Sequence, residues 1–374
     1  MYRDEFPILA DCVYLNSNST GAFPRGMRQV LEEYWQTLAT WRDESWGPWW
    51  AEMHAYADAL AAFVGGPPGS VVTDASLSSL MGRLGTCFSY RAPRNRIVTT
   101  DLDFPTIRFL WKGFARYGAE LVVVKADRDD SVDEDAILAA IDERTLLCSV
   151  THASYKTGAL VDVARVARHC HRAGALIAVD AYQSVGTVPV DVRALDCDFL
   201  LAGAHKWMCG AVESAFMYVR PELLGELEPA ATGWVASEDP LSFGEAVRYA
   251  PSARRFATGT PQVLPCLMSQ IGLDLLAAVG IEAIRAQSLR QTARIMERAD
   301  QAGLTVVTPR EPSRRAGVVG LRFPGDGAVC AEMVRRKLIC SHRGALRIAP
   351  HFYNTDDEVE RFMDELIGLA RGAA

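Results

Sequence analysis

The chain has 374 residues, of which 49% are hydrophobic and 23% are charged, and its formal net charge is −7. This is ordinary globular composition with enough length for two domains, and the lack of a basic surplus argues against a nucleic-acid-binding protein. No apolar run approaches the roughly 20 residues that span a bilayer, and the N-terminal sequence has no apolar export signal. Nine cysteines without CxxC spacing predict free thiols in a reducing compartment, so we expect a cytoplasmic protein and neither a disulfide scaffold nor a zinc ribbon.

The first two-thirds of the chain has the pattern of an α/β domain. Residues 1–45 are predicted to be largely helical, and from about residue 70 short apolar runs alternate with stretches of helical period. The clearest helix is predicted at 161–173, with Gly174 where a helix stop belongs. Strands are predicted at residues 96–100, 121–125, 146–150, 176–180, 198–202 and 215–219. Because strands buried on both faces have this character, we predict a mostly parallel sheet with helices on both sides.

After about residue 250 the pattern changes to α+β. A long helical region is predicted at 261–302, followed by strands and helices at 305–307 (strand), 318–323 (strand), 328–337 (helix), 346–349 (strand) and 356–370 (helix). We therefore predict a large α/β domain over residues 46–250. The smaller α+β domain is predicted over 251–374, together with the N-terminal segment 1–45.

The strongest chemical signal is an acid and a lysine near the ends of two predicted strands. Asp180 ends the run LIAVD, and Lys206 follows the next strand in GAHKWMCG. Both would face the crevice in which open α/β sheets bind ligands. Pyridoxal phosphate requires such a pair, a lysine for the Schiff base and an acid that keeps the ring nitrogen protonated. The alternative is that Asp180 caps a helix and Lys206 is a surface residue.

Three further segments are compatible with the same cofactor. The polar turn at residues 73–78, which contains Ser76 and Leu77, precedes an apolar helical stretch and can bind a phosphate, or it is an ordinary helix cap. Phe104 in DFPT is placed to stack on a ring, or it is a core residue. Arg347 lies in the apolar run ALRIAP and therefore requires an anion, either a substrate carboxylate or an internal salt bridge.

With these residues in view, the chain resembles fold-type I pyridoxal-phosphate enzymes of the class V aminotransferase group, and within that group kynureninase. The matching segments are YLNSNSTGAFP (14–24), WGPWW (46–50), DFPT (103–106), YKTG (155–158), VDAYQSVG (179–186), HKW (205–207), TGW (232–234), RRFATGTP (254–261) and ALRIAPHFYN (345–354). They occur in order over most of the chain. The resemblance implies the fold-type I architecture, with a large domain built on a seven-stranded-type sheet and a smaller C-terminal domain.

The resemblance also implies a role for each matching residue. Lys206 would bind pyridoxal 5'-phosphate and move the Cα proton of the external aldimine, while Asp180 would pair with the ring nitrogen. Arg347 would bind the substrate α-carboxylate. The implied cofactor contacts are Phe104 on the ring, Thr151 close to the cofactor, and Ser76, Leu77, Trp234 and Thr260 at the phosphate, with Thr260 reaching it from the second subunit of a homodimer.

The chain departs from the kynureninase pattern at several positions. Gln183 and His205 stand where kynureninases have His and Tyr, and they are similar instead to the cysteine-desulfurase branch, in which both contact the cofactor. Ile107 and Ser237 replace an acid and a histidine. The reactive cysteine loop of desulfurases is missing, because Cys340 follows an apolar pair and is predicted to end a buried strand.

The function predicted from these residues is a pyridoxal-phosphate enzyme whose small-molecule substrate is an amino acid. We expect kynureninase-like cleavage of a Cβ–Cγ or Cβ–S bond, as a lyase or hydrolase. Two alternatives remain open at this point: a class V aminotransferase or epimerase, and a non-catalytic binding protein that retains the fold. Neither a nucleic acid, a membrane nor a metal ion is an expected partner.

Overall fold

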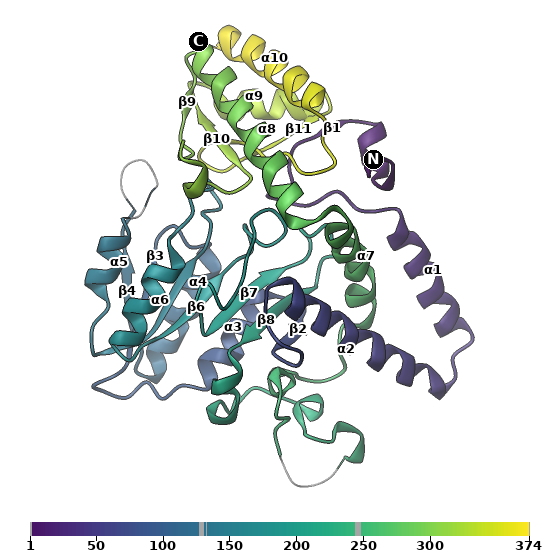
Figure 1. Cartoon of the computed structure of the whole chain (residues 1–374), viewed down its shortest axis with the longest axis vertical. Helices are drawn as coiled ribbons and strands as arrows, with labels where there is room; N and C mark the ends of the chain where they lie inside the picture. Colours follow the sequence, from purple (N-terminus) through teal and green to yellow (C-terminus); the bar gives the residue numbers. More distant parts are fainter. Residues whose placement is uncertain (1, 127–130, 132, 244–247, 374) are drawn as a thin grey trace.

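The computed structural model describes residues 2–126, 131, 133–243 and 248–373, and within them a seven-stranded central sheet carries the large domain (Figure 1). Its strands lie in the order β2 (Val71–Asp74), β8 (Ala215–Val219), β7 (Phe199–Gly203), β6 (Leu176–Asp180), β5 (Thr145–Thr151), β3 (Arg96–Thr100) and β4 (Glu120–Val124). Strand β8 runs antiparallel to β2 and β7, and the pairs from β7 to β4 are parallel. The predicted strands and the mostly parallel sheet are confirmed.

Helices cover both faces of this sheet because its strands bury alternate side chains on opposite sides. On β6, Val179 packs in one hydrophobic cluster and Ala178 in the other. The first cluster includes residues of α2 (Trp46–Phe63), α5 (Glu134–Ala140), α6 (Val163–Arg172) and α7 (Val263–Val279). The second includes residues of α3 (Leu77–Thr86) and α4 (Pro105–Gly113).

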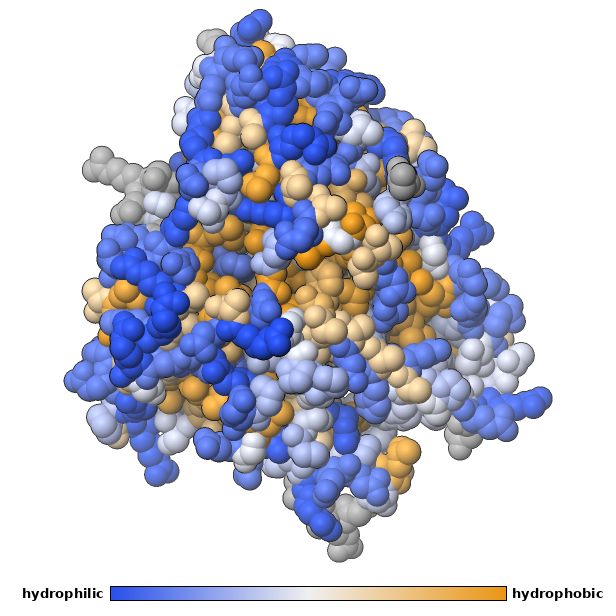
Figure 2. All heavy atoms as spheres, viewed as in Figure 1, coloured by the Kyte–Doolittle hydropathy of each residue, from blue (hydrophilic) through white to orange (hydrophobic). Residues whose placement is uncertain are grey.

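The part of the chain after α7 forms an α+β unit, and the start of the chain contacts both this unit and α7. Its sheet has the order β12 (Ser341–His342), β13 (Leu346–Ile348), β10 (Val319–Arg322) and β9 (Thr305–Val306), and its helices are α8 (Ile281–Gln301), α9 (Asp326–Arg335) and α10 (Asp356–Ala373). Strand β1 (Val13–Tyr14) pairs in parallel with β11 (Leu338–Ile339), and α1 (Gly26–Ala39) contacts α7. Figure 2 shows apolar residues gathered where this domain meets the large one.

The helical region predicted at 261–302 is confirmed, and the structure divides it into two helices. It breaks at Gly280, whose φ of +85° lies in the left-handed region that favours glycine, and α7 and α8 meet at 81°. Helix α7 packs on the large sheet, whereas α8 begins against the same core with Ile284 and continues into the small domain with Ile295, Met296 and Ala299. The domain boundary at 250 stays a prediction. In the described part of the chain no single helix is long and apolar enough to cross a membrane, although α7 and α8 pass that test as one bent pair.

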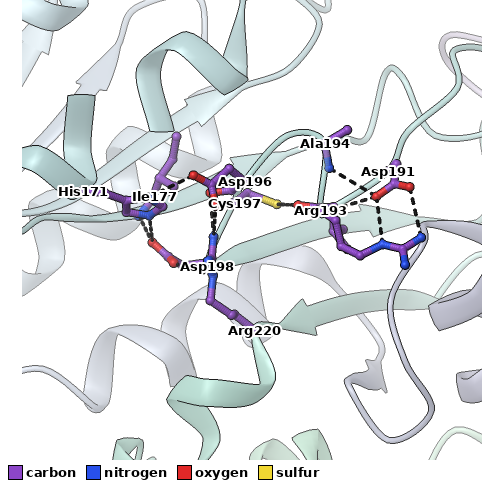
Figure 3. A network of polar contacts seen from close by, with 10 residues as sticks. His171, Ile177, Asp191, Arg193, Ala194, Asp196, Cys197, Asp198 and Arg220 are labelled. Atoms are coloured by element: carbon purple, nitrogen blue, oxygen red, sulfur yellow. Dashed lines mark hydrogen bonds and ion pairs between the residues drawn. The ribbon is translucent and has the colours of Figure 1, made fainter. Parts of the chain in front are cut away.

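A network of hydrogen bonds and ion pairs connects β6, α6 and the residue before β7 at the end of the sheet where β6 and β7 begin (Figure 3). Buried Asp198 accepts a hydrogen bond from the backbone N–H of Ile177 at 2.8 Å and forms an ion pair with Arg220 at 2.9 Å. His171 of α6 lies between Asp198, at 3.1 Å, and Asp196, at 3.2 Å. Because these contacts tie β6, β7 and α6 together at this end, the opposite end of the same strands is held in a fixed register.

Candidate functional site

The predicted residues meet at the carboxyl ends of β5, β6 and β7. Thr151 and Asp180 are the last residues of β5 and β6, and Lys206 follows β7 by three residues. A cavity of about 360 Å³ opens there. Its walls include the predicted Ser76, Leu77, Phe104, Thr151, Asp180, Gln183, His205, Lys206 and Arg347. This is the crevice position expected for a ligand of a parallel α/β sheet.

Lys206 presents a reactive amine inside the cavity. Its Nζ lies 4.6 Å from the ring centroid of Tyr182 and 5.8 Å from that of Phe104. Burial lowers the pKa of Lys206 to about 8, although the charge of Asp180 opposes this effect. A larger fraction of the side chain is therefore neutral and nucleophilic near neutral pH than for an ordinary lysine.

Asp180 is a buried carboxylate, and only one of its two oxygens accepts a hydrogen bond from the described residues. One oxygen, Oδ1, accepts a hydrogen bond from the backbone N–H of Tyr182 at 3.0 Å. Burial raises the pKa of Asp180, while the Tyr182 N–H and the Lys206 charge oppose the shift. A cationic ring nitrogen beside this carboxylate would favour its ionised form. The structure therefore fits the predicted pairing with a pyridinium.

The amino end of α3 forms an anion cradle at one side of the cavity. Ser76 is its N-cap and accepts a hydrogen bond from the Ser79 N–H at 3.1 Å. The other N–H groups of the first turn have no acceptor within a helix, which makes them suited to a phosphate. The nearby Asp74 is neutralised by buried Arg83. Ser76, Leu77 and Ser78 all line the cavity.

Arg347 of β13 lines the cavity and does not use all of its five N–H donors within the described residues. Its two terminal nitrogens donate to the Tyr155 carbonyl at 2.7 Å and to Ser341 Oγ at 3.0 Å, and its buried Nε has no partner within the described residues. Burial, and then the charge of Arg343, lower the pKa of Arg347 to about 10. The described partners of Arg347 are the Tyr155 carbonyl and Ser341 and include no acid, so the internal salt bridge that the sequence left open is absent among these residues. An external carboxylate suits this group.

His205 and Gln183 lie on the cavity wall, in fixed hydrogen bonds. His205 Nδ1 is 3.0 Å from the Tyr182 hydroxyl, and burial together with the Lys206 charge lowers the pKa of His205 to about 4, so the ring is neutral. Gln183 donates to the Asn18 carbonyl at 2.9 Å and accepts from Trp207 Nε1 at 3.0 Å. The described residues supply no acceptor for the second amide hydrogen of Gln183, and the predicted contact of this residue with the cofactor stays a prediction.

Asn18 and Tyr182 are among the cavity residues that sequence reasoning missed. Asn18 is only 1% exposed, yet neither atom of its side-chain amide has a partner within the described residues. A buried, unpaired amide on a cavity wall indicates a ligand contact. Tyr182 lies against β7 because position 203 is glycine, where a Cβ atom would come within 1.9 Å of the Tyr182 hydroxyl. Asn18 stands in a matching segment and Tyr182 beside Asp180, but neither position carried a chemical signal by itself.

Trp234 and Thr260 do not line the cavity of their own chain. Trp234 packs against Trp50 and Phe243, with ring centroids 5.9 and 5.6 Å apart. Thr260 is exposed. Their predicted phosphate contacts stay predictions, and both would have to be made to the cavity of a second subunit.

The remaining departures from the kynureninase pattern are placed as follows. Ile107 is buried and lines the cavity, so the wall is apolar where relatives of that pattern have an acid. Ser237 lies outside the cavity lining. Cys340 lies between β11 and β12, buried, with its Sγ 3.5 Å from Cys330 Sγ. It is not a lining residue, so this thiol does not face the Lys206 amine.

Comparisons with known proteins agree with this geometry. An uncharacterized aminotransferase, YcbU, of Bacillus subtilis (strain 168) is 29% identical over 366 residues, which cover 98% of this chain and 96% of that protein. A kynureninase of Pseudomonas fluorescens is 30% identical over 367 residues, covering 91% and 84%. The solved structure of a C-DES mutant with glycine covalently linked to its PLP cofactor has a TM-score of 0.88 at 19% identity and covers 98% of both chains, which shows the fold. The aminotransferase class-V family model matches residues 85–362. The chain therefore belongs to the class-V aminotransferase family, with the fold-type I architecture of pyridoxal-phosphate-dependent enzymes.

Proposed function

We propose that the protein binds pyridoxal 5'-phosphate through Lys206 and cleaves a Cβ–Cγ or Cβ–S bond of an amino acid. The observation that carries the proposal is the placement of three groups around one cavity: the Lys206 amine, the unpartnered Nε of Arg347 and the hydrogen-bonded Tyr182–His205 pair. The first two serve any reaction at Cα. The third adds a hydroxyl on the ring that covers the amine, and a reaction at Cβ or Cγ requires such a proton donor.

The bound cofactor supplies an electron sink for charge that develops on the substrate. Arg347 binds the α-carboxylate and thereby sets the direction of the Cα–H bond. Lys206, whose pKa is lowered to about 8 by burial, accepts the Cα proton. Tyr182 holds a proton at its hydroxyl, 3.0 Å from neutral His205, and donates it to the group that leaves.

The kynureninase relatives support cleavage as the outcome, because they match nearly the whole chain at 28–30% identity. Product analysis tests the proposal. Cleavage releases alanine, or pyruvate and ammonia, without consuming a keto acid. Turnover that depends on a keto acid and releases no fragment would instead assign transamination, and inversion at Cα without either product would assign epimerisation.

We also propose a homodimer and a cytoplasmic location. The exposed position of Thr260 supports the first proposal, since a residue that reaches the phosphate of a second subunit must lie on the surface of its own. The nine free cysteines support the second, because thiols persist in reducing compartments. Light scattering tests the dimer, which requires twice the 40.9 kDa of one chain.

A further inference from the structure

A second arginine reaches the cavity from the tip of the β12–β13 hairpin. Arg343 lines the same cavity as Arg347 and is exposed, so it stands at the opening. The turn is fixed by a hydrogen bond from the Arg343 N–H to the Ala345 carbonyl at 3.1 Å, and Gly344 has a φ of +74°. Arg343 is therefore held at the opening by its backbone and not by chance contacts of its side chain.

The guanidinium of Arg343 has few partners within the described part of the protein. Among the described residues its side chain makes one hydrogen bond, to the carbonyl of the adjacent His342 at 3.1 Å. The nearby acid, Asp326, contacts His342 at 3.0 Å instead. A guanidinium carries five N–H donors, so most of those on Arg343 are available to a ligand.

The charges around the cavity are unbalanced in favour of cations. Its described lining contains Lys206, Arg343 and Arg347 but one carboxylate only, Asp180. Under the proposed function, Asp180 faces the ring nitrogen, Arg347 takes the α-carboxylate, and the phosphate lies at α3. No anion of the cofactor or of a simple amino acid is left for Arg343. Its charge also lowers the pKa of Arg347, after burial, so an anion near both groups would relieve their repulsion.

We propose that the substrate is an amino acid whose side chain ends in a carboxylate, or in an oxyanion of the same shape, and that Arg343 binds this second anion. This inference rests on the proposed function and names its substrate class. The aromatic pair Phe104 and Tyr155, with ring centroids 5.2 Å apart, also lines the cavity and provides an apolar wall for the methylene groups between the two anions. Arg343 is thus a specificity-determining residue, because it distinguishes acidic from neutral side chains.

Binding of ligands that cannot react tests this inference. Calorimetry on the holoenzyme compares glutarate with glutaramate, in which an amide of similar size replaces one carboxylate. We expect the wild type to bind glutarate about tenfold more tightly, as one charge-assisted hydrogen-bonded pair provides. Arg343→Gln should bring this preference close to one, and Arg343→Lys should retain part of it.

The control variant is Arg116→Gln, which removes the same charge at the exposed η4 helix (Phe114–Tyr117), beyond the far end of α4. It should keep the full preference for glutarate. Equal weakening of both ligands by Arg343→Gln would overturn the inference and assign Arg343 to the carboxylate that Arg347 binds. A wild type without preference, or loss of preference in Arg116→Gln, would also overturn it. The visible absorbance of the Lys206-bound cofactor and the reaction products report separately on the proposed function, so its failure is distinguishable.

Discussion

The Nζ of Lys206 lies over the ring of Tyr182, 4.6 Å from its centroid, while the hydroxyl of the same ring is 3.0 Å from His205 Nδ1. One side chain therefore covers the amine with its ring and shares a hydrogen bond with His205 through its hydroxyl. Gly203 permits this arrangement, because a larger residue on β7 would displace the Tyr182 ring. The two parts of Tyr182 make separable contributions, the ring to the environment of Lys206 and the hydroxyl to proton transfer.

Tyr182→Phe tests the hydroxyl alone, because it keeps the ring over Lys206. We expect kcat for bond cleavage to fall by about 10²-fold, the usual scale for a lost general acid. Exchange of the Cα proton with deuterated solvent should continue at nearly the wild-type rate, since Lys206 performs that step. NMR of the substrate measures exchange and cleavage in the same sample. Equal losses in both would assign Tyr182 a structural role only.

The lowered pKa of Lys206 predicts the pH dependence of cofactor capture. Condensation requires the neutral amine, so the rate at which the apoprotein takes up pyridoxal phosphate should rise with pH and level off above about 8. An ordinary lysine would level off near 10.5. Because the Asp180 charge raises the pKa of Lys206, Asp180→Asn should move the midpoint to lower pH.

Borohydride reduction followed by mass spectrometry measures this uptake at residue 206, and Lys206→Ala supplies the background. A midpoint near 10 in the wild type would contradict the burial of the amine. A midpoint that rises in Asp180→Asn would contradict the placement of the Asp180 carboxylate beside it.

Arg347→Ala tests the carboxylate anchor. Loss of a buried charged contact costs about 2–4 kcal/mol, so KM for the amino acid should rise roughly 30- to 1000-fold. The cofactor should still bind, because Lys206, Asp180 and the α3 cradle are unchanged. Steady-state kinetics and cofactor absorbance measure the two effects. An unchanged KM would return Arg347 to a structural role.

The sequence alone located the centre of this site because strand ends are predictable. Asp180 and Lys206 follow apolar runs, and the carboxyl ends of neighbouring parallel strands necessarily meet at one edge. Asn18 and Arg343 could not be assigned in this way, because they reach the cavity from the N-terminal segment and from a hairpin of the small domain. Their positions depend on how the two domains pack, which no local pattern records.

The same limit explains why the break at Gly280 was not predicted. The apolar period of residues 261–302 continues through Gly280, so the pattern predicts one helical region, whereas tertiary packing turns most of α8 away from the core on which α7 packs. A glycine within a helical pattern is tolerated or is a stop, and only the φ of +85° decides between them. A similar limit applies to the positions of Trp234 and Thr260. Thr260 is predicted to reach the phosphate of a second subunit, and the single chain holds both Trp234 and Thr260 outside its own cavity.

Asp103, in the turn that presents Phe104, predicts a pH dependence of stability. Its Oδ2 accepts hydrogen bonds from Thr99 Oγ at 2.9 Å and from the Thr100 N–H and Oγ at 2.8 and 2.7 Å, while buried Oδ1 has no partner within the described residues. Complete burial raises the pKa of Asp103 to about 7, although the Thr100 and Thr99 hydrogen bonds oppose the shift. The folded state therefore prefers the neutral carboxyl.

The sign of the effect follows from linkage. As pH rises from about 4 to 7, Asp103 ionises in the unfolded chain but not in the folded one, so the free energy of unfolding falls and then stays constant above pH 7. Asp103→Asn keeps the accepting oxygen and removes the ionisation. We expect this variant to gain about 1–4 kcal/mol relative to the wild type between pH 5 and pH 8, measured by urea unfolding.

Asp142→Asn is the matched control, because Asp142 has a shift of opposite sign. Its slight burial would raise its pKa, but the Arg144 N–H and the Arg96 guanidinium outweigh this effect and lower it. A lowered pKa contributes stability above the unfolded value, so Asp142→Asn should lose stability relative to the wild type as pH rises from about 3 to 5. If Asp103→Asn instead lost stability as pH rose from 5 to 8, the Asp103 carboxylate would be ionised and stabilising, and the Phe104 turn would be held by a charge.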